Sequence, residues 1–337
     1  MRILVTGHTG FKGSWLSAML ARQGHQLYGI SLPAAKNSLY LDANLSTLFT
    51  MEAMQDIRDF EGFRQAIEEV NPDQIYHLAA QPLVLESYER PRETYETNFM
   101  GTINLLESLR MMNYQGSLMV VTTDKVYKNL EVKKYYKESD ELAGFDPYSA
   151  SKSSMDLAVQ SWMNTTSTYP VAIVRAGNVV GGGDWAKNRL IPDTFKAMQQ
   201  NQTPSIRNPM SIRPWQHVLD CLQGYLMAME RLTTEKQNEI WNFGPPNGEI
   251  HTVGEVVSKV ANLMGTEYKS KVNVEDTKIE SKTLLLDSSK AREILRWKDK
   301  LTFDQTLSWT IEFYLEQSAG QNSLNLLNNQ IDRHYEL

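Results

Sequence analysis

Short hydrophobic runs recur along the first half of the chain, and segments with helical patterns separate them. Residues 3–5 are apolar throughout, which is typical of a strand that is buried on both faces. Runs of the same kind predict further strands at residues 26–30, 72–80, 117–122 and 171–174. Helices are expected at residues 14–22, 60–70 and 93–112, and from Pro147 onwards. This alternation predicts an α/β fold built on a doubly wound parallel sheet.

Polar residues follow most of these strands, and we expect them to form one site. In doubly wound sheets, ligands bind outside the carboxyl ends of the strands. Polar clusters come after the strands that end near Val5, Ile30, Leu78, Thr122 and Val174. Their common position favours a single binding site over several unrelated polar loops.

Three glycines stand between the first strand and the first helix. Gly7, Gly10 and Gly13 have the spacing of the turn that binds a dinucleotide diphosphate in a Rossmann-type fold. The first allows a tight turn, the second lets the backbone approach the diphosphate, and the third lets helix and strand pack closely. The diphosphate is then expected at the helix N-terminus, where the helix dipole favours anions.

The second strand ends without the carboxylate that often holds the adenosine ribose of NAD. Its end contains Ser31 and Pro33, and Lys36 is the nearest cation. The residues alone therefore leave NAD and NADP both open.

The pattern changes after Asn178, where loops and further helices predict a smaller C-terminal substrate domain. Helices are expected at residues 192–200, 253–264, 288–295 and 303–315, and a strand at 239–243. We assign residues 1–177 and about 213–243 to the cofactor domain, and 178–212 and 244–316 to the substrate domain. The polar, Asn-rich tail at 317–337 is expected to be mobile or loosely docked.

Composition narrows the class of protein. A formal net charge of −6 argues against nucleic-acid binding, and no apolar run in the 337 residues reaches membrane-spanning length. The N-terminus has no signal-peptide pattern, and Cys221 is the only cysteine, so a cytoplasmic location is expected. Cys221 stands in an apolar helical stretch, which favours a buried, inert thiol. We predict no metal site.

Tyr148 and Lys152 lie four residues apart, which places them on one face of the helix after the fourth strand. The lysine cation is expected to lower the pKa of the phenol towards neutrality. Tyr148 then takes a hydroxyl proton while hydride leaves the same carbon for a nicotinamide.

Asp124 and Lys125 follow Thr123 at the end of the fourth strand and offer one proton donor and one acceptor. Lys125 acts as a base only if its pKa is lowered, and nearby cations favour that. The alternative is that Asp124 caps a turn and Lys125 is a solvated charge.

Several longer blocks carry a family resemblance over residues 1–314. They are residues 7–16, 80–84, 123–125 and 146–149, then Arg175-Ala-Gly-Asn-Val-Val-Gly-Gly-Gly-Asp-Trp185, and Ile206-Arg-Asn-Pro209 with Arg213-Pro-Trp-Gln-His217. Together with Tyr148 and Lys152, these blocks resemble the extended short-chain dehydrogenase/reductase superfamily and, within it, the CDP-glucose branch of the nucleotide-sugar 4,6-dehydratases. Thr123-Asp-Lys125 is similar to that branch, whereas most 4,6-dehydratases have Thr-Asp-Glu.

The resemblance implies a cycle of oxidation, water loss and hydride return. Tyr148, helped by Lys152 and Thr123, would remove the 4-hydroxyl proton as hydride passes to NAD. Lys125 would take the C5 proton, and Asp124 would protonate the departing 6-hydroxyl. The product would be a 4-keto-6-deoxy sugar.

The resemblance also implies two sets of binding residues. NAD would be bound by Gly7, Thr9, Gly10, Phe11, Lys12, Gly13, Ser31, Asp56, Ile57, Ala79, Ala80, Gln81, Asn98, Thr122, Tyr148 and Lys152. The nucleotide sugar would be bound by Gln81, Asn178, Arg189, Leu190, Arg207, Arg213 and His217.

Other functions stay open on the sequence alone. A 4-epimerase or reductase shares the first step but needs no acid and base aimed at C5 and C6. A different nucleotide sugar and a non-catalytic dinucleotide sensor are further alternatives. The superfamily implies a homodimer through the helices near 93–112 and 148–168, although Ile103, Leu105, Leu106 and Leu109 suit the protein's own core equally well.

Overall fold

The computed structural model describes the chain except residues 166–167, 207, 267–270 and 273–282. Its centre is a seven-stranded sheet in the order β12-β7-β5-β4-β1-β2-β3, and every neighbouring pair is parallel. The strands are β1 (Arg2–Thr6), β2 (Gln26–Ser31), β3 (Phe49–Met54), β4 (Gln74–His77), β5 (Ser117–Val121), β7 (Val171–Ala176) and β12 (Glu239–Phe243). The predicted fold class is confirmed.

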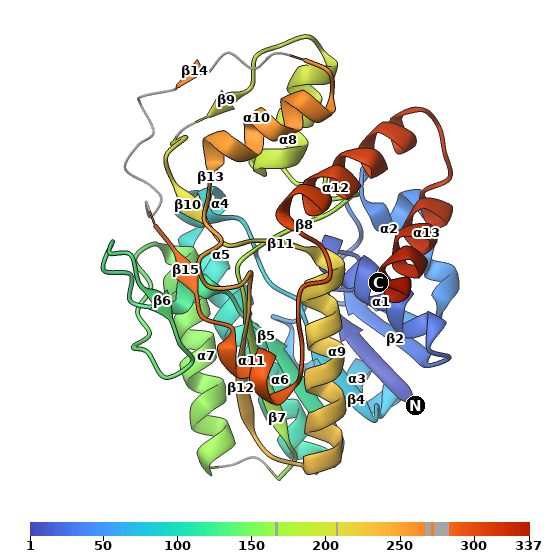
Figure 1. Cartoon of the computed structure of the whole chain (residues 1–337). Coiled ribbons are helices and arrows are strands. Elements are labelled where there is room, and N and C mark those ends of the chain that lie inside the picture. The colour runs from blue at the N-terminus through green and yellow to red at the C-terminus, as the bar shows by residue number, and fades with distance from the viewer. Residues whose placement is uncertain (166–167, 207, 267–270, 273–282) are drawn as a thin grey trace.

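Helices cover both faces of this sheet (Figure 1). Alternate residues of β1 point to opposite faces, so Ile3 and Val5 join one hydrophobic cluster and Leu4 joins the other. The first cluster is covered by α1 (Phe11–Arg22), α2 (Leu39–Asp42) and α9 (Val218–Glu235), and the second by α3 (Phe60–Val70), α6 (Gly101–Met111) and α7 (Pro147–Thr165). The predicted helix at 93–112 is in fact α5 (Pro91–Tyr95), a π-helical turn (Glu96–Met100) and α6.

Strand β3 was missed by the sequence analysis. Its residues, Phe-Thr-Met-Glu-Ala-Met, are half-buried or exposed, and it is the edge strand beside β2. An edge strand does not need the continuous apolar run of a central parallel strand, so its pattern does not stand out.

A third hydrophobic cluster joins α8 (Leu190–Gln199), α10 (Val253–Leu263) and α12 (Phe303–Ser318), which lie together above the sheet in Figure 1. The remaining elements are short: α4 (Val84–Glu89), α11 (Ser289–Ile294), β6 (Tyr135–Tyr136), β8 (Asn178–Val180), β9 (Ser205–Ile206), β10 (Ile212–Arg213), β11 (Trp215–His217), β13 (His251–Thr252), β14 (Lys271–Val272), β15 (Leu285–Leu286) and the 3₁₀ turns Leu45–Leu48 and Asp124–Val126. The domain boundaries stay a prediction. Within the described ranges, no helix is long and apolar enough to cross a membrane.

The C-terminal segment is not a loosely docked tail, so that expectation is wrong. It forms α13 (Ser323–Glu336), which packs against α1, α2 and α12. Leu326, Leu327 and Ile331 are buried in the first cluster, and His334 Nε2 lies 2.8 Å from Asp220 Oδ1. These apolar residues share one helix face, which a high overall Asn content had obscured.

The packing of α13 predicts a large stability difference between two leucines near the C-terminus. Leu327→Ala should lower the free energy of unfolding by about 2–5 kcal/mol, because Leu327 is fully buried and a cavity remains. Leu337→Ala, at an exposed leucine, should change it by less than about 0.5 kcal/mol. Denaturant unfolding measures both values. Equal, small effects would mean that the helix is not docked.

Candidate active site

The glycine turn after β1 leaves no room for side chains. Gly7 has a φ of +74°, and a Cβ atom there would lie 2.7 Å from the backbone nitrogen of Ala79. A Cβ atom on Gly13 would lie 2.2 Å from the Gly7 carbonyl oxygen. The N-cap of α1, Gly10, provides no side-chain hydrogen bond, so the first amide groups of the helix are available to an anion. These features fit the diphosphate of a dinucleotide.

The strand ends beside the turn contain the residues that are predicted to bind the adenosine half of the cofactor. The hydroxyls of Thr9 and Ser31 are hydrogen-bonded at 2.7 Å, which joins the turn to the end of β2. Asp56, just after β3, accepts hydrogen bonds from Arg58, and these bonds hold the pKa of its carboxyl below the ordinary value. Ile57 is buried and packs against the α carbon of Gly101.

Asn98 links the loop after β4 to α7. The Asn98 side chain accepts from the Gln81 backbone N–H at 2.8 Å and donates to the Gln81 carbonyl and to Ser151 Oγ at 3.1 and 2.9 Å. Asn98 lies in the π-helical turn, a distortion that is frequent at functional sites. Its polar atoms are thus used within the protein, while Ala79 and Ala80 stay partly accessible.

Tyr148 and Lys152 lie together on α7 and are both buried. Lys152 Nζ donates to the Val121 carbonyl at 3.3 Å. Burial lowers the pKa of Lys152 to about 7, and the charge of Lys12 acts in the same direction. Lys152 therefore reaches the end of β5, and Tyr148 reaches the residues just after it through its hydrogen bond with Thr123.

The predicted lowering of the Tyr148 pKa is wrong for this arrangement. Burial raises the pKa of Tyr148 to about 12, because the free energy lost when a phenolate leaves water exceeds the stabilisation that neighbouring groups give it. A hydrogen bond with the Thr123 side chain and the charge of Arg189 oppose the rise.

Asp124 and Lys125 form the short 3₁₀ turn directly after β5. Asp124 is buried and its Oδ1 accepts from the Thr123 hydroxyl at 3.1 Å, whereas Oδ2 has no hydrogen-bond partner among the described residues. Burial raises the pKa of Asp124, and the charges of Lys125 and Arg213 oppose the rise. The N-cap of this turn is Thr123, which accepts from the Lys125 N–H, so Asp124 is not the capping side chain.

Two arginines lie on the side of the third cluster and act on the catalytic residues. Arg189 precedes α8, and its Nε is 3.8 Å from Asp184 Oδ2. The charge of Arg189 opposes the rise in the pKa of Tyr148. The charge of Arg213, on β10, opposes the rise in the pKa of Asp124. Arg189 and Arg213 thus belong to the same electrostatic environment as the proton-transfer groups.

The other predicted substrate residues that the structure describes have no contact with Tyr148 or Asp124 among those given above. Asn178 begins β8 and is partly buried, as is Leu190 at the start of α8. His217 is fully buried between Trp15 and Trp309, and its Nδ1 accepts from the Leu219 N–H as the N-cap of α9. Its ring therefore stabilises the start of α9. Arg207 lies outside the described residues.

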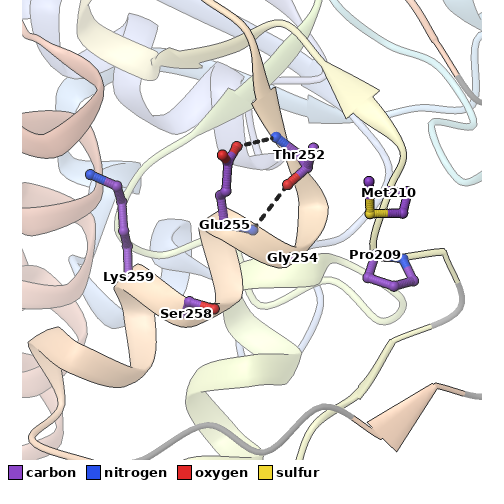
Figure 2. Close-up of a pocket in the computed structure, with 7 residues that line it drawn as sticks. All are labelled: Pro209, Met210, Thr252, Gly254, Glu255, Ser258 and Lys259. Atoms are coloured by element: carbon purple, nitrogen blue, oxygen red, sulfur yellow. Dashed lines mark hydrogen bonds between the residues drawn. The ribbon is translucent and has the colours of Figure 1, made fainter.

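A separate hollow of about 540 Å³ opens at the start of α10, lined by Pro209, Met210, Thr252, Gly254, Glu255, Ser258 and Lys259 (Figure 2). None of the predicted site residues lines it. Figure 2 shows that Thr252 and Glu255 hydrogen-bond each other as a capping box, which engages these polar groups within the protein.

Burial of Lys152 predicts a pH-dependent cost in stability. Its pKa is about 7 in the folded protein and 10.5 when exposed, so the unfolded chain binds more protons between these values. Lys152→Met should raise the free energy of unfolding by on the order of a few kcal/mol at pH 7 and below. The gain should shrink as the pH rises towards 10. Thermal unfolding at several pH values measures it, with exposed Lys128→Met as control. A stability gain that is independent of pH would contradict the lowered pKa of Lys152.

Comparisons with known proteins identify the family of this chain. The model of the GDP-mannose 4,6 dehydratase family matches residues 4–310. A CDP-glucose 4,6-dehydratase from Salmonella typhimurium is 42% identical over 96% of this chain and 93% of its own length. Among solved structures, a UDP-glucose 4-epimerase from Thermotoga maritima with UDP-glucose has a TM-score of 0.84 at 23% identity, covering 94% of this chain and 100% of that one. A dTDP-glucose 4,6-dehydratase from Bacillus anthracis, in complex with NAD, has a TM-score of 0.80 at 24% identity, covering 96% and 99%. The chain therefore belongs to the GDP-mannose 4,6-dehydratase family, and it is a nucleotide-sugar 4,6-dehydratase.

Proposed function

We propose that the protein converts CDP-glucose to CDP-4-keto-6-deoxyglucose, with NAD as its cofactor. The observation that carries the proposal is the buried Asp124 with the partly buried Lys125 next to it, on the turn whose Thr123 is hydrogen-bonded to Tyr148. The 42% identity to a CDP-glucose 4,6-dehydratase supports this choice of substrate.

Tyr148 removes the 4-hydroxyl proton in the first step. The chemistry that bound NAD would supply is hydride transfer, out from C4 and later back to C6. A hydrogen bond with the Thr123 side chain and the positive charge of Arg189 favour the Tyr148 phenolate. The ammonium form of Lys152, one helical turn away, is proposed to add to this effect. The resulting 4-keto group makes the C5 proton acidic.

Lys125 and Asp124 then carry out the loss of water. In its neutral form Lys125 would take the C5 proton, and Asp124, whose pKa is raised by burial, would give a proton to the departing 6-hydroxyl. The Lys125 ammonium returns its proton to C5 when hydride reaches C6. Asp124 is reprotonated at the expense of Tyr148 through solvent, so the net change is the loss of one water.

The glycine turn and the neighbouring strand ends are proposed to hold NAD. The first amides of α1, at Phe11, Lys12 and Gly13, would bind the diphosphate. Asp56 and Ile57 would contact the adenine and Ser31 the ribose. The related structure from Bacillus anthracis contains NAD, which supports NAD over NADP.

The nucleotide sugar is proposed to lie between the catalytic residues and the third cluster. Arg189 and Arg213 would bind its diphosphate, because a guanidinium group donates two parallel hydrogen bonds. Gln81, Asn178 and Leu190 would complete this site. Arg207 is included from its sequence alone, and His217 acts by holding α9.

We also propose a homodimer. Leu105, Leu106 and Leu109 lie in the protein's own core. By contrast, Met100 and Leu157 are 44% and 52% exposed on elements that contact each other, the π-helical turn and α7. This exposed apolar surface suits a second copy of the chain.

Product mass tests the substrate and the reaction together. Incubation with CDP-glucose and NAD should remove one water from the sugar nucleotide and leave no net reduced nicotinamide. CDP-glucose that keeps its mass while another nucleotide sugar loses water would correct the substrate. A product of unchanged mass and altered configuration would instead support the epimerase alternative.

Two variants should separate the two halves of the reaction. Lys125→Ala removes the C5 base, so dehydration should fall by roughly 10²–10⁴-fold while reduced nicotinamide still forms. Tyr148→Phe removes the C4 base, so both should fall. Stopped-flow absorbance of the nicotinamide and mass analysis of the sugar measure these effects. Dehydration at the wild-type rate in Lys125→Ala would contradict the role of Lys125.

A further inference from the structure

A buried ion pair lies directly behind the catalytic residues. Asp156 stands one helical turn after Lys152 on α7, and Arg175 lies on β7. Arg175 Nε and Nη2 donate to the two carboxylate oxygens of Asp156 at 2.8 and 2.7 Å, and both side chains are 0% exposed. Such a two-bond contact fixes direction as well as distance between the two elements.

This pair holds both flanks of the segment that carries Asp124 and Lys125. On one flank, the Thr122 hydroxyl donates to Asp156 Oδ2 at 3.0 Å. On the other, Arg175 Nη1 donates to the Tyr127 hydroxyl at 2.9 Å. The segment with Asp124 and Lys125 is therefore held at both ends by hydrogen bonds to the Asp156–Arg175 ion pair.

The second flank is fixed further by β12. The Tyr127 hydroxyl donates to Asn242 Oδ1 at 2.7 Å, and Asn242 Nδ2 donates to the carbonyls of Tyr136 and Asp287 at 3.0 and 3.1 Å. The Tyr127 hydroxyl thus both accepts and donates, and its ring stacks on that of Tyr136 with centroids 5.3 Å apart.

We propose that Asp156, Arg175, Thr122 and Tyr127 form a positioning clamp that holds Asp124 and Lys125 in register with Tyr148 and Lys152. By fixing these distances, the clamp lets elimination of water at C5 and C6 follow oxidation at C4 without delay. This inference rests on the proposed function, because it assigns oxidation to α7 and elimination to the clamped segment.

Loosening the clamp should affect the two half-reactions unequally. Tyr148 and Lys152 stay on α7, so oxidation at C4 keeps its geometry. Asp124 and Lys125 lose their fixed distance from the sugar, and small misplacements of reacting groups lower rates strongly. Oxidised sugar and reduced nicotinamide should then accumulate, which a merely structural role of the clamp would not cause.

Tyr127→Phe is the most conservative test, because it removes one hydroxyl and keeps the ring. Its matched control is Tyr136→Phe, since Tyr136 is a buried neighbour whose hydroxyl bonds Asn129 and Leu130 instead. Thr122→Val tests the other flank, and because Thr122 is also a predicted NAD contact, the affinity of this variant for NAD is measured as well. Each variant is measured for dehydration rate, for reduced nicotinamide during turnover, for KM, and for amide hydrogen exchange at residues 123–126.

Tyr127→Phe and Thr122→Val should lower the dehydration rate by about tenfold or more, with a small change in KM. Both should also raise the fraction of reduced nicotinamide and speed amide exchange at 123–126, and Tyr136→Phe should do neither. Folded Tyr127→Phe that behaves like Tyr136→Phe overturns the clamp, and if Tyr127→Phe does not fold, the result with Thr122→Val decides. If the wild-type protein dehydrates no nucleotide sugar, the proposed function fails, and the exchange rates alone then support or overturn the clamp.

Discussion

The close contact between the glycine turn and the end of β4 is the constraint on which the site depends. Gly7 can adopt its positive φ and approach Ala79 only because it has no side chain. Gly13 similarly lets α1 start directly against the turn. These two contacts bring the open amides of α1 beside the carboxyl ends of β4 and β5, so that the predicted diphosphate site and the predicted catalytic residues lie at one edge of the sheet.

Burial then sets the chemistry at that edge. The same low-dielectric surroundings raise the pKa of Asp124 and of Tyr148 and lower that of Lys152. A carboxyl whose pKa is raised is suited to giving a proton, whereas the phenol needs added positive charge before it can act as a base. The folded protein bears the cost of keeping ionisable groups out of water at its functional site.

Those features of the fold and the site that depend on neighbouring residues in the chain were predicted from the sequence. The central strands, the glycine turn and the spacing of Tyr148 and Lys152 each depend on a few neighbouring residues, and the structure has them as expected. The edge strand β3, the docked helix α13 and the capping role of His217 depend on contacts with distant segments. The Asp156–Arg175 pair is of the same kind, because its partners are 19 residues apart and only the fold brings them together. The raised pKa of Tyr148 could not be inferred from the Lys152 spacing, since burial is a property of the whole fold.

We propose that one site oxidises C4, removes water and reduces C6 without releasing the hydrogen taken from C4. The sharpest test uses CDP-glucose labelled with deuterium at C4, with the product examined by NMR after turnover in ordinary water. The deuterium should appear at C6 of the same product molecule. Loss of the label to solvent or its retention at C4 would contradict a closed cycle within one pocket.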